Sequence, residues 1–444
     1  MKKLWQKNIE SSKEVESFTI GKDRELDMHL APFDVLGSLA HIQMLGKIQL
    51  LTSKELKTLQ LGLKEIYKDI QTGKFKLEPG VEDIHSQVEI ILTKKFGDTG
   101  KKIHSARSRN DQVLVDLKLY LRHEIEYLVG DVNELFQLLL KQSEKYKNFL
   151  YPGYTHLQLA MPSSFGLWFG AYAESLTDDL ITLHAAWEIV NKNPLGSAAG
   201  YGSSFPVDRE LTTKLLGFED MNYNVVYAQM GRSKTERIVA QALANISATL
   251  ARMSMDACLY LNQNFGFISF PDEFTTGSSI MPHKKNPDVF ELIRAQCNRI
   301  QALPNEIMMI STNLPSGYHR DFQLLKEDVI PAFKNLRNCI SMAAMMIKNI
   351  QVRKDILQDE KYKYLFSVEE MNKLVLQGMP LRDAYQKIAV EIGNNNFKYS
   401  SQIHHTHIGS IGNLQNKAIK QIMDNIIGRF NFIKVNDALQ KLLK

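Results

Sequence analysis

The chain has 444 residues, 44% of them hydrophobic and 23% charged, which is the composition of a globular protein long enough for about three domains. Its net charge is only +5 and no run of Lys and Arg alternates with aromatic residues, so a nucleic-acid-binding protein is not expected. There is no run of about 18 apolar residues, the first residues lack the apolar core of a signal peptide, and the three cysteines lack metal-ligand spacing; these features predict a cytoplasmic protein that does not enter a membrane.

Residues 1–110 combine short helical patterns with turns. Apolar residues at helical spacing over 56–66 predict one amphipathic helix, and a second is expected to open after Pro79-Gly80 and to end at Gly97. This part of the chain is predicted to form a small N-terminal helical domain.

From Asp111 to about Tyr146 apolar residues recur every three or four positions, which predicts one helix of about 36 residues. Four more long helices are expected: one after Pro162, one opened by a Ser233–Glu236 capping box, one from Asn286-Pro287 to Pro304, and one over about 322–350 with a kink at Pro331. Strand signals are sparse, so the fold class is all-α. The five helices predict a central bundle domain over 111–352, and shorter patterns predict a small C-terminal helical domain over 353–444.

Helices of this length are too long to be buried by one compact chain. Their apolar stripes favour a bundle in which helices from several subunits pack together. A monomeric long-helix protein is the alternative.

Polar segments interrupt the apolar helices at four places. Residues 104–112 precede the first long helix, where Ser108 or Asn110 could cap it and free N–H groups with two arginines would bind a carboxylate. Residues 153–158 join the first two long helices and offer Thr155 as a carboxylate-binding hydroxyl and His156 as an acid or base. A solvated helix start and a solvated loop histidine are the plain alternatives.

The third polar segment, residues 275–288, contains Gly, Ser, Lys and Asn before a helix. Lys284 suits a developing negative charge, Ser278 a proton transfer and Asn286 a carboxylate, and Glu291 on the following helix could orient a histidine from elsewhere. The fourth segment, residues 314–327, offers Tyr318, Gln323 and Lys326 as ligands. A solvated linker and a charged helix start are the alternatives here.

Helix length adds a geometric expectation. If the first two long helices are antiparallel, Asn110 and His156 lie at opposite ends of the bundle, on the order of 50 Å apart in one chain. They could then share a site only across subunits. No metal cluster, phosphate-binding glycine loop or dinucleotide motif is evident, and His404, His405 and His407 lack a carboxylate or thiolate partner at helical spacing, so neither metal nor cofactor is expected.

Taken together, these segments resemble one superfamily. Residues 277–287 (Gly-Ser-Ser-Ile-Met-Pro-His-Lys-Lys-Asn-Pro) are similar to the signature loop of the fumarase/aspartase superfamily. Within it, the argininosuccinate lyase family is resembled by five other segments, in order along the chain: residues 37–41, 82–85 (Glu-Asp-Ile-His), 107–112 (Arg-Ser-Arg-Asn-Asp-Gln), 153–158 (Gly-Tyr-Thr-His-Leu-Gln), and 193–196 with 205–209.

The resemblance implies an all-α homotetramer with a central bundle of twenty helices and active sites each lined by three subunits. It also implies a carbon–nitrogen lyase of arginine biosynthesis that cleaves argininosuccinate reversibly to arginine and fumarate, without metal or organic cofactor.

The resemblance also implies roles for individual residues. Ser278 matches the catalytic base, Lys284 and Asn286 stabilise the charge of the intermediate, and His156 paired with Glu291 serves the leaving group. Ser108, Asn110 and Thr155 match contacts to the fumarate half of the substrate. Contacts to the arginine half are matched by Asp83, Arg109, Tyr318, Gln323 and Lys326. Asp27 aligns with an early family aspartate, His85 is a site histidine, and Ser279 is a substrate contact and the next candidate for the base.

Some positions depart from the family pattern. The family's early Leu-Trp-Gly-Gly-Arg-Phe is Leu-Trp-Gln-Lys-Asn-Ile at residues 4–9, Asp23 stands where a substrate-binding serine is common, and His283 replaces a common glutamine. The His283-Lys284 pair is also frequent in adenylosuccinate lyases, which are the enzymatic alternative. A non-catalytic structural homologue of the lens-crystallin kind is the other alternative, although the catalytic residue types are all present.

Overall fold

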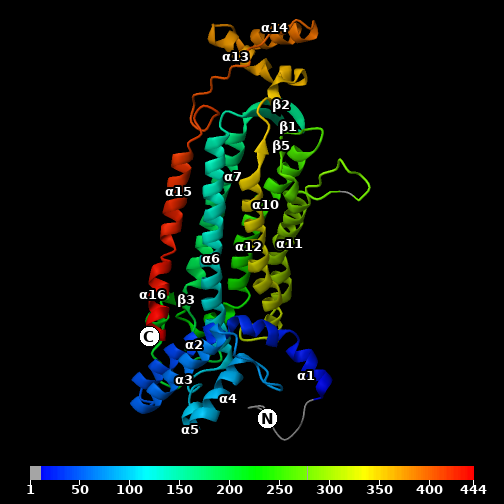
Figure 1. Cartoon of the computed structure of the whole chain (residues 1–444). Coiled ribbons are helices and arrows are strands. Elements are labelled where there is room, and N and C mark those ends of the chain that lie inside the picture. Colours follow the sequence, from blue (N-terminus) through cyan, green and yellow to red (C-terminus); the bar gives the residue numbers. More distant parts are fainter. Residues whose placement is uncertain (1–11, 278) are drawn as a thin grey trace.

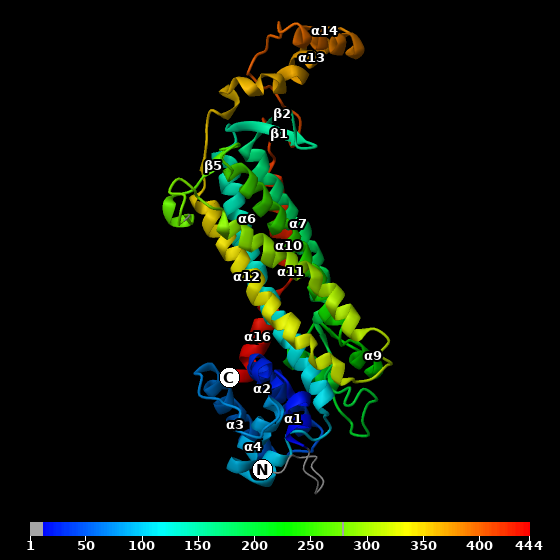
Figure 2. The same cartoon turned by 90° about the vertical axis from the view of Figure 1, so that its right-hand side faces the viewer.

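Long helices run side by side along the axis of the molecule in both views (Figure 1; Figure 2). The computed structural model describes residues 12–277 and 279–444, so residues 4–9 and Ser278 lie outside the described part. The bundle consists of α6 (Arg109–Lys145), α7 (Phe165–Val190), α10 (Lys234–Leu261), α11 (Asp288–Ser311) and α12 (Leu325–Asn349). The predicted all-α class is confirmed. No helix in the described part is long and apolar enough to cross a membrane.

Apolar faces at helical spacing hold the bundle together. On α10, for example, Val239, Leu243, Ile246 and Leu250 are almost fully buried against α7, α11 and α12. Fully burying one such side chain stabilises the fold by about 1.5–3 kcal/mol. The helical spacing of apolar residues in the sequence therefore predicts which side chains of the bundle are buried.

Helix ends differ from the sequence-based expectations at three points. Ser233 has a positive φ of 63° and its side chain caps nothing, because Glu236 accepts a hydrogen bond from Arg232 instead (2.8 Å), so the predicted capping box is wrong. Helix α11 begins at Asp288 and runs through Pro304 to Ser311; burial of Leu303 and Ile307 around the proline offsets its cost.

Likewise, α12 begins at Leu325 and continues through Pro331.

The N-terminal helices gather at one end of the bundle, which we call the N-terminal pole (Figure 2). They are α1 (Lys13–Ile20), α2 (Asp23–Lys47), α3 (Ser53–Gln71), α4 (Ile84–Phe96) and α5 (Asp98–Lys101). Helix α2 is buried along most of its length and packs on α3, α4 and α6. The pole thereby fixes the start of α6 against the start of α4.

The opposite end of the bundle carries a β-hairpin and the start of the C-terminal segment (Figure 1). Strands β1 (Leu150–Thr155) and β2 (Gln158–Ser164) are antiparallel, and α13 (Ser367–Leu376) and α14 (Leu381–Gly393) lie beyond them. Helices α15 (Asn416–Arg429) and α16 (Phe432–Leu443) then return along the bundle to the N-terminal pole. The domain boundaries at 110 and 352 stay predictions.

The remaining elements are short and join the bundle helices. Two-stranded pairs are formed by β3 (Lys192–Asn193) with β4 (Asp220–Met221), and by β5 (Ile268–Ser269) with β6 (Gln351–Val352). Short helices α8 (Arg209–Leu215) and α9 (Val225–Met230) lie between α7 and α10.

Candidate active site

The start of α6 is a capped helix terminus at the N-terminal pole. Ser108 is the N-cap: its Oγ accepts a hydrogen bond from the backbone N–H of Asn110 (3.2 Å), and Asp111 Oδ1 accepts one from the backbone N–H of Ser108 (2.9 Å). Of the two predicted cap candidates, Ser108 is confirmed, and Asn110 lies within the helix. Because the first N–H groups of a helix point outward and carry partial positive charge, this terminus favours a carboxylate.

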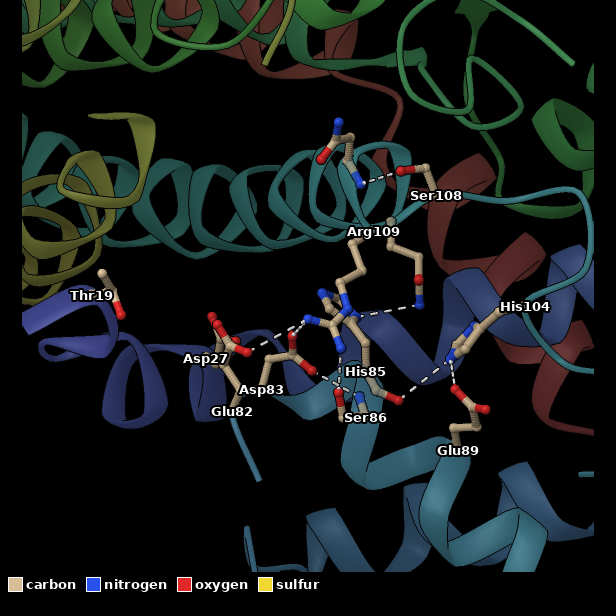
Figure 3. Close-up of polar contacts among 12 residues, drawn as sticks. Thr19, Asp27, Glu82, Asp83, His85, Ser86, Glu89, His104, Ser108 and Arg109 are labelled. Atoms are coloured by element: carbon tan, nitrogen blue, oxygen red, sulfur yellow. Dashed lines mark hydrogen bonds and ion pairs between the residues drawn. The ribbon is translucent and has the colours of Figure 1, made fainter. Parts of the chain in front are cut away.

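Arg109 ties the start of α6 to the start of α4 (Figure 3). Its guanidinium forms an ion pair with Asp83 Oδ2 (3.0 Å) and donates a hydrogen bond to Ser86 Oγ (2.8 Å), while Asp83 caps α4 by accepting from the backbone N–H of Ser86 (2.8 Å). Burial alone would raise the pKa of Asp83, but the charges of His85 and Arg109 lower it below its ordinary value. The Arg109 side chain remains 38% exposed, so part of its guanidinium is open to a ligand.

Lys326 lies between two carboxylates of α2. Its ammonium pairs with Asp27 (2.6 Å) and with Asp23, and Lys326 and Asp27 are almost completely buried. Burial raises the pKa of Asp23, the position where the family commonly has serine. Two acidic groups around one ammonium leave surplus negative charge, which suits a cationic group of a ligand.

The segment before α12 faces the same pole. The Gln323 side-chain amide donates to the carbonyl oxygens of Thr19 (3.1 Å) and Ile20 (3.0 Å), at the end of α1. Its N–H groups are therefore occupied within the chain, whereas the Tyr318 side chain is exposed. Arg320 also contacts this region, donating to Thr19 O (2.9 Å) and Glu82 Oε1 (3.1 Å).

His85 belongs to a buried polar cluster beneath Arg109. Its Nδ1 is 2.8 Å from Asp34 Oδ1 and 3.7 Å from Asp116 Oδ2. Although burial lowers the pKa of His85, the charge and hydrogen bond of Asp34, followed by the charges of Asp116 and Asp83, raise it to about 9. Asp34, His85 and Asp116 are the one group among the described residues whose potential metal-ligand atoms lie within 4.8 Å of one another. The short Asp34–His85 hydrogen bond and the nearby Arg107 cation fit a protonated imidazole there, and not a metal ion.

The hairpin at the far end presents Thr155 and His156. Both are exposed, and His156 and Leu157 at the turn have positive φ values of 53° and 59°. Helix α6 has 37 residues, about 55 Å at 1.5 Å per residue, so His156 and Asn110 of one chain lie at opposite ends of the bundle, as predicted (Figure 1).

The loop over residues 275–288 projects from the side of the bundle, and its base is closed by specific contacts (Figure 1). The backbone N–H of Asn286 donates to Thr276 O (2.8 Å), the Asn286 side chain donates to Gly277 O (3.3 Å), and Lys285 pairs with Asp272. Asn286 therefore braces the loop and does not cap α11, although an asparagine directly before Pro287 predicts an N-cap followed by proline at the first helical position.

Lys284 and Ser279 are exposed on this loop, and Lys284 has no side-chain ion pair with any described residue. Glu291, in the first turn of α11, is also exposed, and no contact joins it to His156 in the described chain. The predicted pairing of His156 with Glu291 is thus not made within one chain and stays a prediction for an assembly.

One chain brings together only part of the predicted site. The N-terminal pole unites Asp27, Asp83, His85, Ser108, Arg109, Asn110, Tyr318, Gln323 and Lys326. Thr155 with His156, and the 275–288 loop with Glu291, lie elsewhere along the bundle. Asp34 and Asp116 were missed by the sequence analysis; their signal is a carboxylate within an otherwise apolar stretch, Phe-Asp-Val-Leu at 33–36 and Val-Asp-Leu at 115–117.

Comparison with known proteins gives evidence that is independent of this geometry. A family model described as lyase matches residues 5–302. The chain is 59% identical to the argininosuccinate lyase of Phocaeicola vulgatus over 99% of both chains, and 39% identical to that of Thermotoga neapolitana over 88% of this chain and 98% of the relative. Among solved structures, a variant of EDDS lyase with bound fumarate superimposes with a TM-score of 0.76 at 18% identity, covering 98% of this chain and 95% of that one. At this low identity, the likeness to EDDS lyase shows that the two chains share a fold.

Proposed function

The chain belongs to the argininosuccinate lyase family of the fumarase/aspartase superfamily, and we propose that it cleaves argininosuccinate reversibly into arginine and fumarate. The observation that carries the proposal is 59% identity over 99% of the chain to a relative named for this activity. The clamp of Arg109 and Asp83 beside the capped start of α6 supports it chemically, because an anion site and a cation site lie next to each other.

In the proposed reaction Ser278 takes a proton from the carbon next to a carboxylate of the succinyl half. Negative charge then builds on that carboxylate, where Lys284 stabilises it with Asn286, a residue that also braces the loop. The carbon–nitrogen bond breaks with the electron pair leaving on the guanidino nitrogen, and His156, oriented by Glu291, supplies the proton that this nitrogen takes up. A serine base needs nearby positive charge and exclusion of water, both of which closure of the 275–288 loop would provide.

The proposed substrate orientation follows the charges of the N-terminal pole. The fumarate half lies against the α6 terminus, contacting Ser108, Asn110 and, from the hairpin, Thr155; Ser279 is a further contact from the loop. The arginine half lies toward Arg109, Asp83 and the Lys326 cluster with Asp27, near His85, Tyr318 and Gln323. Asp23 adds a second carboxylate beside Lys326, which favours the ammonium at the amino-acid end of that half.

We further propose that four copies assemble into a homotetramer in which each site takes residues from three chains. Support comes from the separation of the three groups of site residues along one bundle and from large apolar side chains exposed on its helices: Ile181, Met255, Leu292, Met308, Met309 and Met345. The arginine-biosynthetic role, a cytoplasmic location and the absence of nucleic-acid and membrane partners complete the proposal; three free thiols suit a reducing compartment.

Exchange of Arg109 for lysine is expected to raise KM about 10-fold with a smaller change in kcat. An ammonium cannot reproduce the forked contact to Asp83 and Ser86 while also reaching a ligand, and one charge-assisted hydrogen bond is worth about 1.5–3 kcal/mol. Steady-state kinetics measure both constants. A KM equal to that of the unaltered enzyme would remove Arg109 from the substrate site.

The function itself is tested by the ultraviolet absorbance of fumarate. We expect fumarate to appear with argininosuccinate and not with adenylosuccinate. Turnover of adenylosuccinate instead would favour the enzymatic alternative. A folded protein that releases fumarate from neither substrate would favour the crystallin-like alternative.

A further inference from the structure

Three buried groups from three helices meet beneath the substrate-binding face of the N-terminal pole. Asp34 on α2, His85 on α4 and Asp116 on α6 are each at most 3% exposed. Asp34 Oδ1 accepts a short hydrogen bond from His85 Nδ1 (2.8 Å), and the Gln112 side-chain nitrogen lies 3.3 Å from both Asp34 Oδ1 and His85 Nδ1. The Asp34 carboxylate therefore fixes both the orientation and the protonation of the ring nitrogen it contacts.

The second ring nitrogen of His85 is turned away from this contact. His85 Nε2 has no hydrogen bond to a described residue, and it is not completely sealed from solvent. Figure 3 shows His85 extending from α4 toward the contact of Arg109 with Asp83. An imidazolium with Nδ1–H on Asp34 consequently has one charged donor left, on the side of the site.

We propose that Asp34 is a positioning residue for substrate binding: it holds His85 doubly protonated, so that the Nε2–H of His85 donates to an anionic oxygen of the substrate beside Arg109. The proposal rests on the proposed function, since it takes argininosuccinate as the anion. Asp34 acts only through His85 and does not touch the substrate. This arrangement is separate from the expected pairing of His156 with Glu291, which serves the leaving group.

Several charged groups act on the His85 ring from the elements packed around it. The pKa of His85 is raised to about 9 despite burial, which lowers it, and Asp34 makes the largest favourable contribution. The groups are Asp34 on α2, Asp116 on α6, Asp83 before α4, and Arg107 with His104 before α6. Without the Asp34 charge, the largest contribution that raises the pKa of His85 is lost while burial still lowers it, so we expect the pKa of the ring to fall.

The test compares Asp34→Asn, His85→Gln and the double variant, each assayed for KM and kcat between pH 6 and 9. For the unaltered enzyme we expect a KM that is flat from pH 6 to about 8, because His85 stays charged. For Asp34→Asn, KM should approach the normal value at pH 6 and exceed it about 10-fold at pH 8, with kcat changed less than about 3-fold. The double variant should bind no worse than His85→Gln, since Asp34 has no role once the ring is gone.

Asp179→Asn is the matched control. Asp179 on α7 is a buried carboxylate that accepts a hydrogen bond from Thr249 (2.7 Å) in the middle of the bundle, outside the site. The same substitution there should leave the pH profile of KM unchanged. A pH-independent KM in Asp34→Asn, additive losses in the double variant, or a stoichiometric divalent ion that is lost with Asp34 would each overturn the proposal.

A direct titration separates this inference from the proposed function. With histidine labelled at Cε1, the resonance absent from His85→Gln should titrate near pH 9 in the unaltered protein and below pH 7 in Asp34→Asn, whether or not argininosuccinate is turned over. An unaltered protein that releases no fumarate contradicts the function alone; an unshifted His85 titration contradicts the inference alone. If Asp34→Asn does not fold, His85→Gln must by itself raise KM about 10-fold at pH 7, and an unchanged KM overturns the proposal.

Discussion

Replacement of Lys284 by methionine is expected to lower kcat about 10²–10³-fold, the usual cost of removing one preorganised group that stabilises transition-state charge. The Lys284 ammonium is exposed on the 275–288 loop and makes no ion pair with a described residue, so it is free to meet the carboxylate on which charge develops. Methionine keeps the length and apolar volume of the side chain and removes only the charge. Single-turnover release of fumarate measures the effect on chemistry apart from product release.

The neighbouring lysine supplies the matched control. Lys285 pairs with Asp272 at the base of the loop, and an exposed ion pair of this kind contributes only about 0–1 kcal/mol. Lys285→Met is therefore expected to keep kcat within about 3-fold of normal. If the two variants lost activity equally, the loop would matter for its folding and not for the Lys284 charge.

The sequence predicted the bundle well because long helices carry their own signal. The stripe over residues 111–146 became α6 (Arg109–Lys145), and its N-cap, Ser108, was one of the two candidates, since capping depends on residues close in sequence. The failures have long-range causes. Glu236 pairs with Arg232 in place of Ser233, and Pro304 is tolerated because its neighbours are buried against other helices.

The same difference between local signals and long-range contacts decides which parts of the candidate site could be predicted. Motifs such as residues 107–112 could be recognised locally, and helix length alone predicted that Asn110 and His156 lie at opposite ends of one chain. The Asp34–His85–Asp116 cluster could not be predicted, because its three members come from three helices and meet only when α2, α4 and α6 pack. The proposed sharing of sites between subunits depends on contacts between chains, which the packing of one chain does not determine.

Activity is expected to return when two inactive variants are combined in one oligomer. Ser278→Ala and His156→Asn should each lower kcat about 10²–10³-fold alone, as losses of groups that act in the proton transfers. If each site takes the loop from one chain and the hairpin from another, random assembly of equal amounts leaves both groups intact in about one quarter of the sites. Co-expression of the two chains with different tags, followed by selection of mixed oligomers, permits a direct comparison with the unaltered enzyme.

The control for this recovery pairs two variants of the same loop. Ser278 and Lys284 always enter a site on one chain, so mixed oligomers of Ser278→Ala with Lys284→Met contain no intact site and should remain inactive. Recovery in the first mixture and none in the second would place loop and hairpin on different subunits. No recovery in either mixture would instead put the loop and the hairpin of each site on the same chain, and near-normal turnover by Ser278→Ala alone would transfer the role of the base to Ser279.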